Sequence, residues 1–255
     1  MTSSDLWDRE TADRYDDASA GMFAPEVLDP TVRALADLAA LAGDRPVLEL
    51  AIGTGRVAIP LAERGLEVHG IELSAPMAER LHAKRRRAER PDLPVVVGDV
   101  ATATAPGAGT YGLVLLVFNT LGNLRTQDEQ VAVFANAARH LAPGGRFVVE
   151  LGVPGLRRLP PGQTAIPFEV ADHHVGFDTY DPATQQATSH HYTREADGSF
   201  RYGRHNFRYV WPAECDLMAR LAGMTLERRT ADWHGTPFTA ESGSHVSVWR
   251  KPTAA

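Results

Sequence analysis

A glycine-rich turn constrains the fold of this chain more than any other feature of its sequence. Gly53 and Gly55 stand one residue apart in "LELAIGTGR", after an apolar run at 46–51 and before a predicted helix at 54–65. Residues 53–58, "GTGRVA", fit the pattern G-x-G-x-x-G/A, which joins a strand to a helix in nucleotide-binding folds. The pattern alone leaves three readings open. It can hold a nucleotide's phosphates, hold a different adenosine-containing cofactor, or form a tight turn without a ligand.

Strands and helices alternate through the first 151 residues. The predicted strands are 46–51, 66–73, 93–100, 111–118 and 142–151. The predicted helices are 5–18, 30–42, 54–65, 74–90 and 126–141, with Asp29 as N-cap of the second and "TQDE" as a capping box for the last. Strands that alternate with helices and are apolar on both faces predict a parallel, doubly wound α/β sheet.

The pattern changes after about residue 155. Three segments within 168–211 are rich in aromatic and β-branched residues and are separated by the turn sequences "DPATQQ" and "ADGS". They predict a three-stranded antiparallel layer, followed by a helix at 212–224 and two final strands. We therefore expect four parts, in chain order: an N-terminal helical lid at 1–45, an α/β cofactor-binding core at 46–151, an antiparallel insert for substrate or oligomer contacts at 152–211, and a closing helix and hairpin at 212–255.

Composition and charge narrow the class of protein. The chain has 255 residues, 44% of them hydrophobic and 23% charged, as in an ordinary globular protein. Its net charge of −6 argues against a nucleic-acid partner. The single Cys215 allows no intrachain disulfide, the acidic N-terminal segment is unlike a signal peptide, and apolar runs such as 113–118 are too short for a bilayer. These features predict a cytoplasmic protein without a membrane partner.

Three acidic residues stand at the ends of successive predicted strands. Glu49 lies just before the glycine turn, where an anion disfavours a pyrophosphate and suits an ammonium or sulfonium group. Glu72 ends the second strand, where a carboxylate can accept hydrogen bonds from both ribose hydroxyls. Asp99 stands at the end of the third strand and can accept from an adenine amine. Because ligands bind at the carboxyl edge of such sheets, the three acids are expected to line one crevice.

At this point the sequence resembles a known family. "VLELAIGTGR", "GIELSAPM", "VVVGDV", "FNTLGNL" and "LAPGGRFVVEL" are similar, in order and spacing, to successive motifs of class I S-adenosylmethionine-dependent methyltransferases. Residues 211–251 resemble the closing helix and hairpin of that fold. The resemblance is closest to bacterial small-molecule enzymes that modify amino sugars and other secondary metabolites. It implies a Rossmann-like, mostly parallel seven-stranded sheet with an antiparallel β insert after strand 5.

The resemblance also implies a cofactor, S-adenosyl-L-methionine, released as S-adenosyl-L-homocysteine, and a set of residues that bind it. These are Glu49, Ala51, Gly53 and Gly55 for the methionine part; Arg56 for its carboxylate; Glu72 for the ribose; Leu73, Asp99 and Val100 for the adenine; Phe118, Asn119 and Thr120 near the methyl group; and Tyr15 as a closing residue. Ile52 departs from the family pattern, in which cysteine is frequent, but a buried side chain there changes little.

Methyl transfer is an in-line displacement that gains much of its rate from alignment and desolvation. An amine acceptor needs only to be neutral and positioned, whereas a hydroxyl benefits from a base. His174, Tyr192 and His234 are our candidates for that role, chosen from a larger group that includes His191 and His205. Adjacent strand residues point to opposite faces, so one histidine of each pair in the insert can face a pocket. The alternative is that these histidines are ordinary surface or interface residues. No acid or cysteine spacing supports a metal site.

The aromatic strip at 200–211 admits three interpretations: a substrate pocket, a homodimer interface through the insert, or a half-buried strand. The leading functional hypothesis is methyl transfer to nitrogen or oxygen of a small-molecule acceptor, such as a bacterial secondary metabolite. Two alternatives remain open from the residues themselves. One is an NAD(P)-dependent oxidoreductase that uses the same glycine turn. The other is a non-methylating cyclase or binding protein on this scaffold.

Overall fold

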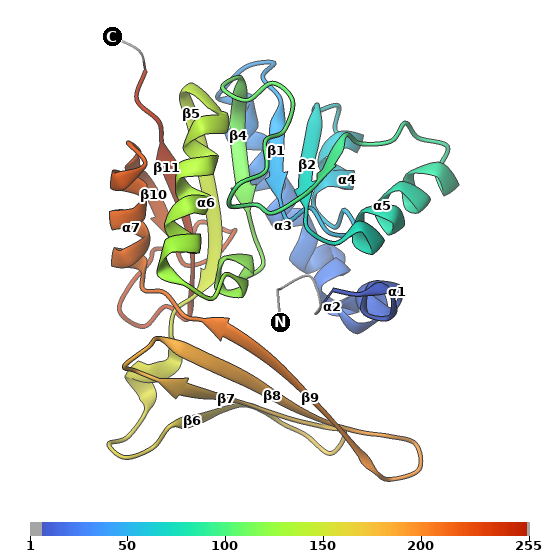
Figure 1. The fold of residues 1–255 in the computed structure, drawn as a ribbon, viewed down its shortest axis with the longest axis vertical. Helices are drawn as coiled ribbons and strands as arrows, with labels where there is room; N and C mark the ends of the chain where they lie inside the picture. Colours follow the sequence, from blue (N-terminus) through green and yellow to red (C-terminus); the bar gives the residue numbers. More distant parts are fainter. Residues whose placement is uncertain (1–6, 254–255) are drawn as a thin grey trace.

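The computed structural model describes residues 7–253 and contains two separate sheets (Figure 1). Sheet A has seven strands in the order β10-β11-β5-β4-β1-β2-β3. β11 runs antiparallel to β5 and β10, and the remaining pairs are parallel. The bounds are β1 Val47–Leu50, β2 Val68–Glu72, β3 Val95–Val97, β4 Tyr111–Leu116, β5 Leu141–Gly152, β10 Thr225–Thr230 and β11 Ser244–Arg250. The predicted doubly wound, mostly parallel α/β sheet is confirmed.

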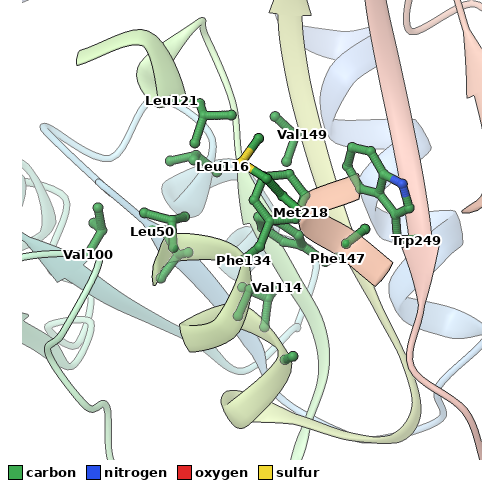
Figure 2. Packing of buried hydrophobic residues seen from close by; sticks show 14 of the residues in the cluster. Leu50, Val100, Val114, Leu116, Leu121, Phe134, Phe147, Val149, Met218 and Trp249 are labelled. Atoms are coloured by element: carbon green, nitrogen blue, oxygen red, sulfur yellow. The ribbon is translucent and has the colours of Figure 1, made fainter. Parts of the chain in front are cut away.

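Helices cover both faces of sheet A, which gives the molecule two apolar cores. On one face lie α6 (Gln127–His140) and α7 (Pro212–Leu221), and on the other α3 (Pro25–Ala40), α4 (Ala58–Glu63) and α5 (Ala75–Arg87). In the first core, the ring of Phe134 packs edge-on against Phe147 and Trp249, with centroids 5.1 and 5.3 Å away (Figure 2). The predicted capping box at the start of α6 is present, made by Thr126 and Glu129.

The N-terminal helices differ from the prediction in their boundaries. The first is α1 (Arg9–Ala18), begun by Asp8 as N-cap, and a short α2 (Ala20–Phe23) follows it. Residues 1–6, which include the start of the expected helix and lid, lie outside the described residues. The helix predicted at 30–42 corresponds to α3, which begins at Pro25 and not at Pro30. Proline is favoured in the first turn of a helix, which Pro25 occupies, so Pro30 lies inside the helix; the buried residues of α3 all follow Pro30.

The insert contains four strands, so the prediction of three is wrong. Sheet B consists of β6 (Ala165–Val170), β7 (His174–Asp181), β8 (Gln186–Arg194) and β9 (Phe200–Arg208), paired antiparallel in that order. "FEVADHHVGFDTY" holds the end of β6 and most of β7. They are joined by a tight turn in which Ala171 and His174 exchange backbone hydrogen bonds of 2.9 and 3.3 Å. That turn contains neither glycine nor proline, so the sequence carries no strong turn signal there.

Sheet B is the next sheet in the chain after β5, with a short 3-10 helix (Gly155–Arg158) between them, and it lies at the edge of sheet A where the parallel strands end. Figure 1 shows sheet B below this edge, with α1 and α2 beside it. Ligands of open parallel sheets bind at that edge. The strand order thus places the insert, the N-terminal helices and the glycine turn around one space. No helix within residues 7–253 combines the length and the apolar composition needed to cross a bilayer.

Candidate active site

A cavity of about 1220 Å³ lies between the carboxyl edge of sheet A, α1 and sheet B. A site for one small ligand typically encloses roughly 300–1,000 Å³, so this space is large enough for two molecules side by side. One end is formed by the loops of sheet A and by α1; its lining includes Tyr15, Ala51, Gly53, Glu72, Leu73, Asp99, Val100, Phe118, Asn119 and Thr120. The other end is formed by sheet B and the start of α6; its lining includes Arg125, Phe168, Asp178, Tyr180, Ser189, His191, His205 and Phe207.

The glycine turn after β1 has a left-handed backbone at three positions. Ala51, Gly53 and Gly55 have φ values of +55°, +57° and +84°. A Cβ atom on Gly55 would stand 2.9 Å from the Ile59 side chain, so only glycine fits there. Ala51 holds an unfavourable conformation for a residue with a side chain, and such strain is found most often at ligand sites.

The Glu72 carboxylate anchors this turn to the next loop. Its Oε2 accepts a hydrogen bond of 2.8 Å from the Gly53 N–H, and its Oε1 accepts one of 2.8 Å from the Ser74 N–H. Burial raises the pKa of Glu72, although backbone donors of Ser74, Gly53 and Leu73 oppose the shift. Each carboxylate oxygen can accept a second bond, so a fixed carboxylate faces the cavity and can accept from a pair of hydroxyls.

Glu49 is buried behind the glycine turn and does not line the cavity, and neither do Gly55 and Arg56. Within the described residues, its Oε2 atom has no hydrogen-bond partner. Burial raises the pKa of Glu49 to about 8, while nearby Arg56 and the Ala58 N–H act in the opposite direction. A buried carboxyl group with an unused oxygen is costly, and a cationic or donor group beside it would remove that cost.

Asp99 stands exposed at the cavity wall after β3, and its neighbour Val100 is buried. Its Oδ1 accepts a hydrogen bond of 2.8 Å from the Ala101 N–H. This bond fixes the loop and leaves further acceptor capacity for a ligand amine.

Two residues after β4 share an unusual backbone conformation. Phe118 and Asn119 both have left-handed φ values, +60° and +59°. Glu150 of β5 supports them, because its Oε2 accepts a hydrogen bond of 2.9 Å from the Phe118 N–H. Its other oxygen accepts 2.8 Å from the Trp233 Nε1–H. Sequence reasoning missed Glu150, although its acid at the end of the apolar run "RFVVEL" was the available signal.

Asp16 ties helix α1 to the sheet A end of the cavity. One oxygen of this carboxylate accepts 2.6 Å from the Thr54 hydroxyl of the glycine turn, and the other pairs with Lys84 of α5 at 2.5 Å. Trp7, just before α1, accepts a bond from the Ser74 hydroxyl at its carbonyl and packs edge-on against Tyr15, with centroids 5.8 Å apart. Sequence reasoning missed Trp7, a lone aromatic residue in a polar segment.

The sheet B end presents a carboxylate and two imidazoles. Asp178 of β7 accepts hydrogen bonds from the Ser189 hydroxyl and, at 3.1 Å, from the Tyr180 hydroxyl. His205 of β9 has its Nε2 2.9 Å from the Asn123 side-chain oxygen. Burial lowers the pKa of both His191 and His205, so both rings are neutral at pH 7.

None of the three catalytic candidates lines the cavity. Tyr192 lies on the opposite face of sheet B from His191 and packs on Tyr202, with centroids 5.0 Å apart. His234 is exposed in the turn after β10. His174 lies one residue behind the wall, with its Nε2 3.1 Å from the Nδ1 of His191. Strand alternation predicts that only one member of the pair 190–191 faces the cavity, but it does not say which one.

No group of three acidic, histidine or cysteine side chains in the described part of the chain is arranged to hold a metal ion.

Comparison with known proteins agrees with this geometry. A model of the methyltransferase domain matches residues 47–145. A cypemycin N-terminal methyltransferase from a Streptomyces species is 30% identical over 209 residues, which cover 80% of this chain and 82% of the relative. The chain belongs to the methyltransferase family. The CcbJ methyltransferase structure from Streptomyces caelestis matches this enzyme with 40% identity and a TM-score of 0.75, over 89% of this chain and 90% of that one.

A third relative matches a shorter part of the chain. A dTDP-3-amino-3,4,6-trideoxy-α-D-glucopyranose N,N-dimethyltransferase from Streptomyces venezuelae is 33% identical over 104 residues, which cover 41% of each chain. The expectation of a class I S-adenosylmethionine-dependent methyltransferase is confirmed. The comparisons give no support for an oxidoreductase or for a non-methylating protein on this scaffold.

The residues present fit that cofactor on two observations of the structure. Within the described part of the chain, the Oε2 of Glu49 has no hydrogen-bond partner, and it suits a positively charged group beside the glycine turn. The anchored carboxylate of Glu72 suits a ribose diol at the cavity wall.

Glu49→Gln should stabilise the ligand-free methyltransferase at alkaline pH. The folded pKa of Glu49, about 8, lies above its ordinary value of 4.5. The free energy of unfolding of the wild type therefore falls as the pH rises from about 4.5 to about 8, because the Glu49 carboxyl group ionises more readily in the unfolded chain. Glutamine does not ionise and causes no such fall. We expect the free energy of unfolding of the variant to exceed the wild-type value by about 1–4 kcal/mol above pH 8, and by little near pH 4.

Denaturant titration across this pH range measures the difference, with the exposed Glu63→Gln as a matched control. A constant difference at every pH would contradict the assignment of the shift to Glu49.

Proposed function

We propose that this methyltransferase transfers the methyl group of S-adenosylmethionine to an amine nitrogen of a small secondary metabolite. The observation that carries the proposal is the chemistry of the sheet B end of the cavity. Asp178 offers a negative charge that attracts an ammonium group, and the neutral His191 and His205 can accept a proton. A hydroxyl acceptor would gain less from Asp178. Two of the relatives described above are named for methyl transfer at an N-terminus and at an amino-sugar nitrogen.

In this proposal the cofactor occupies the sheet A end of the cavity, where it supplies an electrophilic methyl group on a sulfonium. Glu72 accepts hydrogen bonds from the ribose hydroxyls, while Leu73, Asp99 and Val100 hold the adenine. Glu49, Ala51, Gly53, Gly55 and Arg56 form the surroundings of the methionine part. Phe118, Asn119 and Thr120 lie between this end and the acceptor end, so they border the reacting methyl group.

The four parts expected from the sequence take separate roles in this proposal. In the expected lid at 1–45, α1 covers the cofactor, with Asp16 and Tyr15 closing over the glycine turn, while α3 packs on sheet A. The core at 46–151 binds the cofactor, the insert at 152–211 binds the acceptor, and residues 212–255 complete sheet A. Enclosure by the lid and the insert removes water from the reacting atoms and aligns them for displacement. His234 and Tyr192 lie outside the cavity and take no part. A cytoplasmic location without a nucleic-acid partner fits the charge of −6 and the single cysteine.

Glu72→Ala should weaken cofactor binding by about 1–3 kcal/mol, because a buried carboxylate that accepts from ribose hydroxyls is lost. Calorimetric titration with S-adenosylmethionine and S-adenosylhomocysteine measures the effect, with NADH as the negative control ligand. Glu63→Ala, a change of an exposed acid, should leave the affinity unaltered. Equal affinity in Glu72→Ala and the wild type would refute the ribose role.

Two matched pairs of acceptors test the choice of nitrogen. The probes are dTDP-3-amino-3,4,6-trideoxyglucose with its 3-hydroxy counterpart, and trialanine with its N-acetylated form. We expect S-adenosylhomocysteine release and a one-methyl mass gain with an amine probe and none with its partner. Asp178→Asn should raise the KM for the amine, since it removes the attracting charge. Methylation of the hydroxyl probe alone would contradict the proposal and identify the enzyme as an O-methyltransferase.

We also propose that two copies associate through the outer face of sheet B. This face carries exposed apolar side chains, of which Val170, Tyr192, Phe200 and Tyr202 are 77%, 37%, 55% and 48% exposed. Contiguous apolar patches of this kind often mark an interface. Light scattering should report a dimer for the wild type and a monomer for Tyr202→Arg, whereas Leu221→Arg on α7 should remain dimeric. A monomeric wild type would exclude the interface.

A further inference from the structure

Three side chains from three neighbouring strands form a hydrogen-bonded chain that ends at the cavity wall. Glu169 of β6 places its Oε2 2.8 Å from the Nδ1 of His174 of β7. The Nε2 of His174 lies 3.1 Å from the Nδ1 of His191 of β8. Of the three, His191 lines the cavity. This hydrogen-bonded chain therefore leads from the outside of the insert to the sheet B end of the cavity, where the acceptor is proposed to bind.

With a neutral His174 ring, the order of atoms in this chain sets the position of each proton. A carboxylate only accepts, so the Nδ1 of His174 carries the hydrogen of the neutral ring and its Nε2 holds a lone pair. That lone pair accepts from the Nδ1–H of His191. The Nε2 of His191 is then the unprotonated nitrogen, and it makes no hydrogen bond within the described residues. This is the tautomer that a general base requires.

Burial keeps this arrangement intact. The His174 side chain is 16% exposed, whereas that of Glu169 is 46% exposed and in contact with water. Phe168 covers the pair, with its ring centroid 5.4 Å from His191 and 6.4 Å from His174. The other imidazole of the acceptor end, His205, already uses its Nε2 on Asn123.

We infer that His191 is the general base that removes the proton from the ammonium form of the acceptor, and that Glu169 and His174 are positioning residues that hold its tautomer. The inference rests on the proposed methylation of an amine. In the step, a proton moves from the ammonium nitrogen to the Nε2 of His191, which becomes an imidazolium. The freed nitrogen lone pair forms the new bond to the methyl carbon, the bond from that carbon to sulfur breaks, and its electron pair stays on sulfur. The imidazolium loses its proton to water once the product leaves.

The charges around His191 set the sign of its pH dependence. Burial, His174 and its strand neighbour His190 lower the pKa of His191, whereas Asp178 and Glu169 raise it. His205 on β9 also faces His191, and Arg125 lowers the pKa of His205. Removing the charge of Glu169 should therefore lower the pKa of His191 further. In a pH profile of kcat, the acidic limb of Glu169→Gln should move to lower pH.

Two matched pairs of variants test the inference with the trialanine and amino-sugar probes. His191→Gln should lower kcat by about 10²-fold to 10⁴-fold, the range of a lost general base, while the outward-facing His190→Gln should not. His174→Gln should cause a smaller loss, and its exposed neighbour His173→Gln none. The calorimetric affinity for S-adenosylmethionine should be the same in all four. Equal kcat in His191→Gln and His190→Gln would overturn the inference, whereas a wild type that methylates no amine would overturn the proposed function.

A measurement that needs no acceptor distinguishes a failure of the inference about His191 from a failure of the proposed amine methylation. Long-range ¹H–¹⁵N correlation spectra of the full chain report the tautomer of each histidine. We expect Nδ1–H on both His174 and His191 in the wild type. In Glu169→Gln, whose amide can also donate to His174, the Nε2–H form of His191 should grow. Nε2–H on His191 in the wild type would overturn the inference, whatever the activity.

Discussion

The Glu72 carboxylate is the contact on which the arrangement of the cofactor end depends. By accepting from the N–H groups of Gly53 and Ser74, it fixes the glycine turn after β1 against the start of α5. Ser74 in turn caps α5 with its hydroxyl and binds the Trp7 carbonyl, which positions the segment leading into α1. One buried acid thus orders two loops and the entry to a helix. Burial in this position removes water from the Glu72 carboxylate, and the loss of solvation raises the pKa of Glu72.

Different interactions hold the polar groups in place at the two ends of the cavity. At the sheet A end, the strained turn of Phe118 and Asn119 and the buried Glu49 are unfavourable features that the surrounding α/β core is large enough to hold. At the sheet B end, side chains on one face of an antiparallel sheet are in register, so polar groups from neighbouring strands meet in pairs. Asp178 stands opposite Ser189 in that register. A rigid core with a separable insert lets one methyl-donor site serve acceptors of differing shape.

Enclosure links the two ends. Tyr15 and Trp7 from the N-terminal segment and His205 from sheet B approach one another, with the Trp7 and His205 rings 6.4 Å apart. Ion pairs on the surface, Arg9 with Glu79 and Asp13 with Arg80, contribute little individually because they are solvated. The partly buried Asp16 is the stronger tie between α1 and the glycine turn. On this side the cavity is therefore bordered by a helix that Asp16 holds against the glycine turn and α5.

The sequence by itself determined the alternation of strands and helices, the glycine turn with its required Gly55, and the placing of Glu72 and Asp99 at the carboxyl ends of strands. Each depends on local periodicity, on backbone conformation or on the rule that parallel strands end at one edge. The tertiary structure alone decided that Glu150 supports Phe118, that an unsignalled turn divides β6 from β7, and that His191 lines the cavity with His174 behind it. Those facts depend on cross-strand register and burial, which join residues far apart in the chain and leave no local pattern.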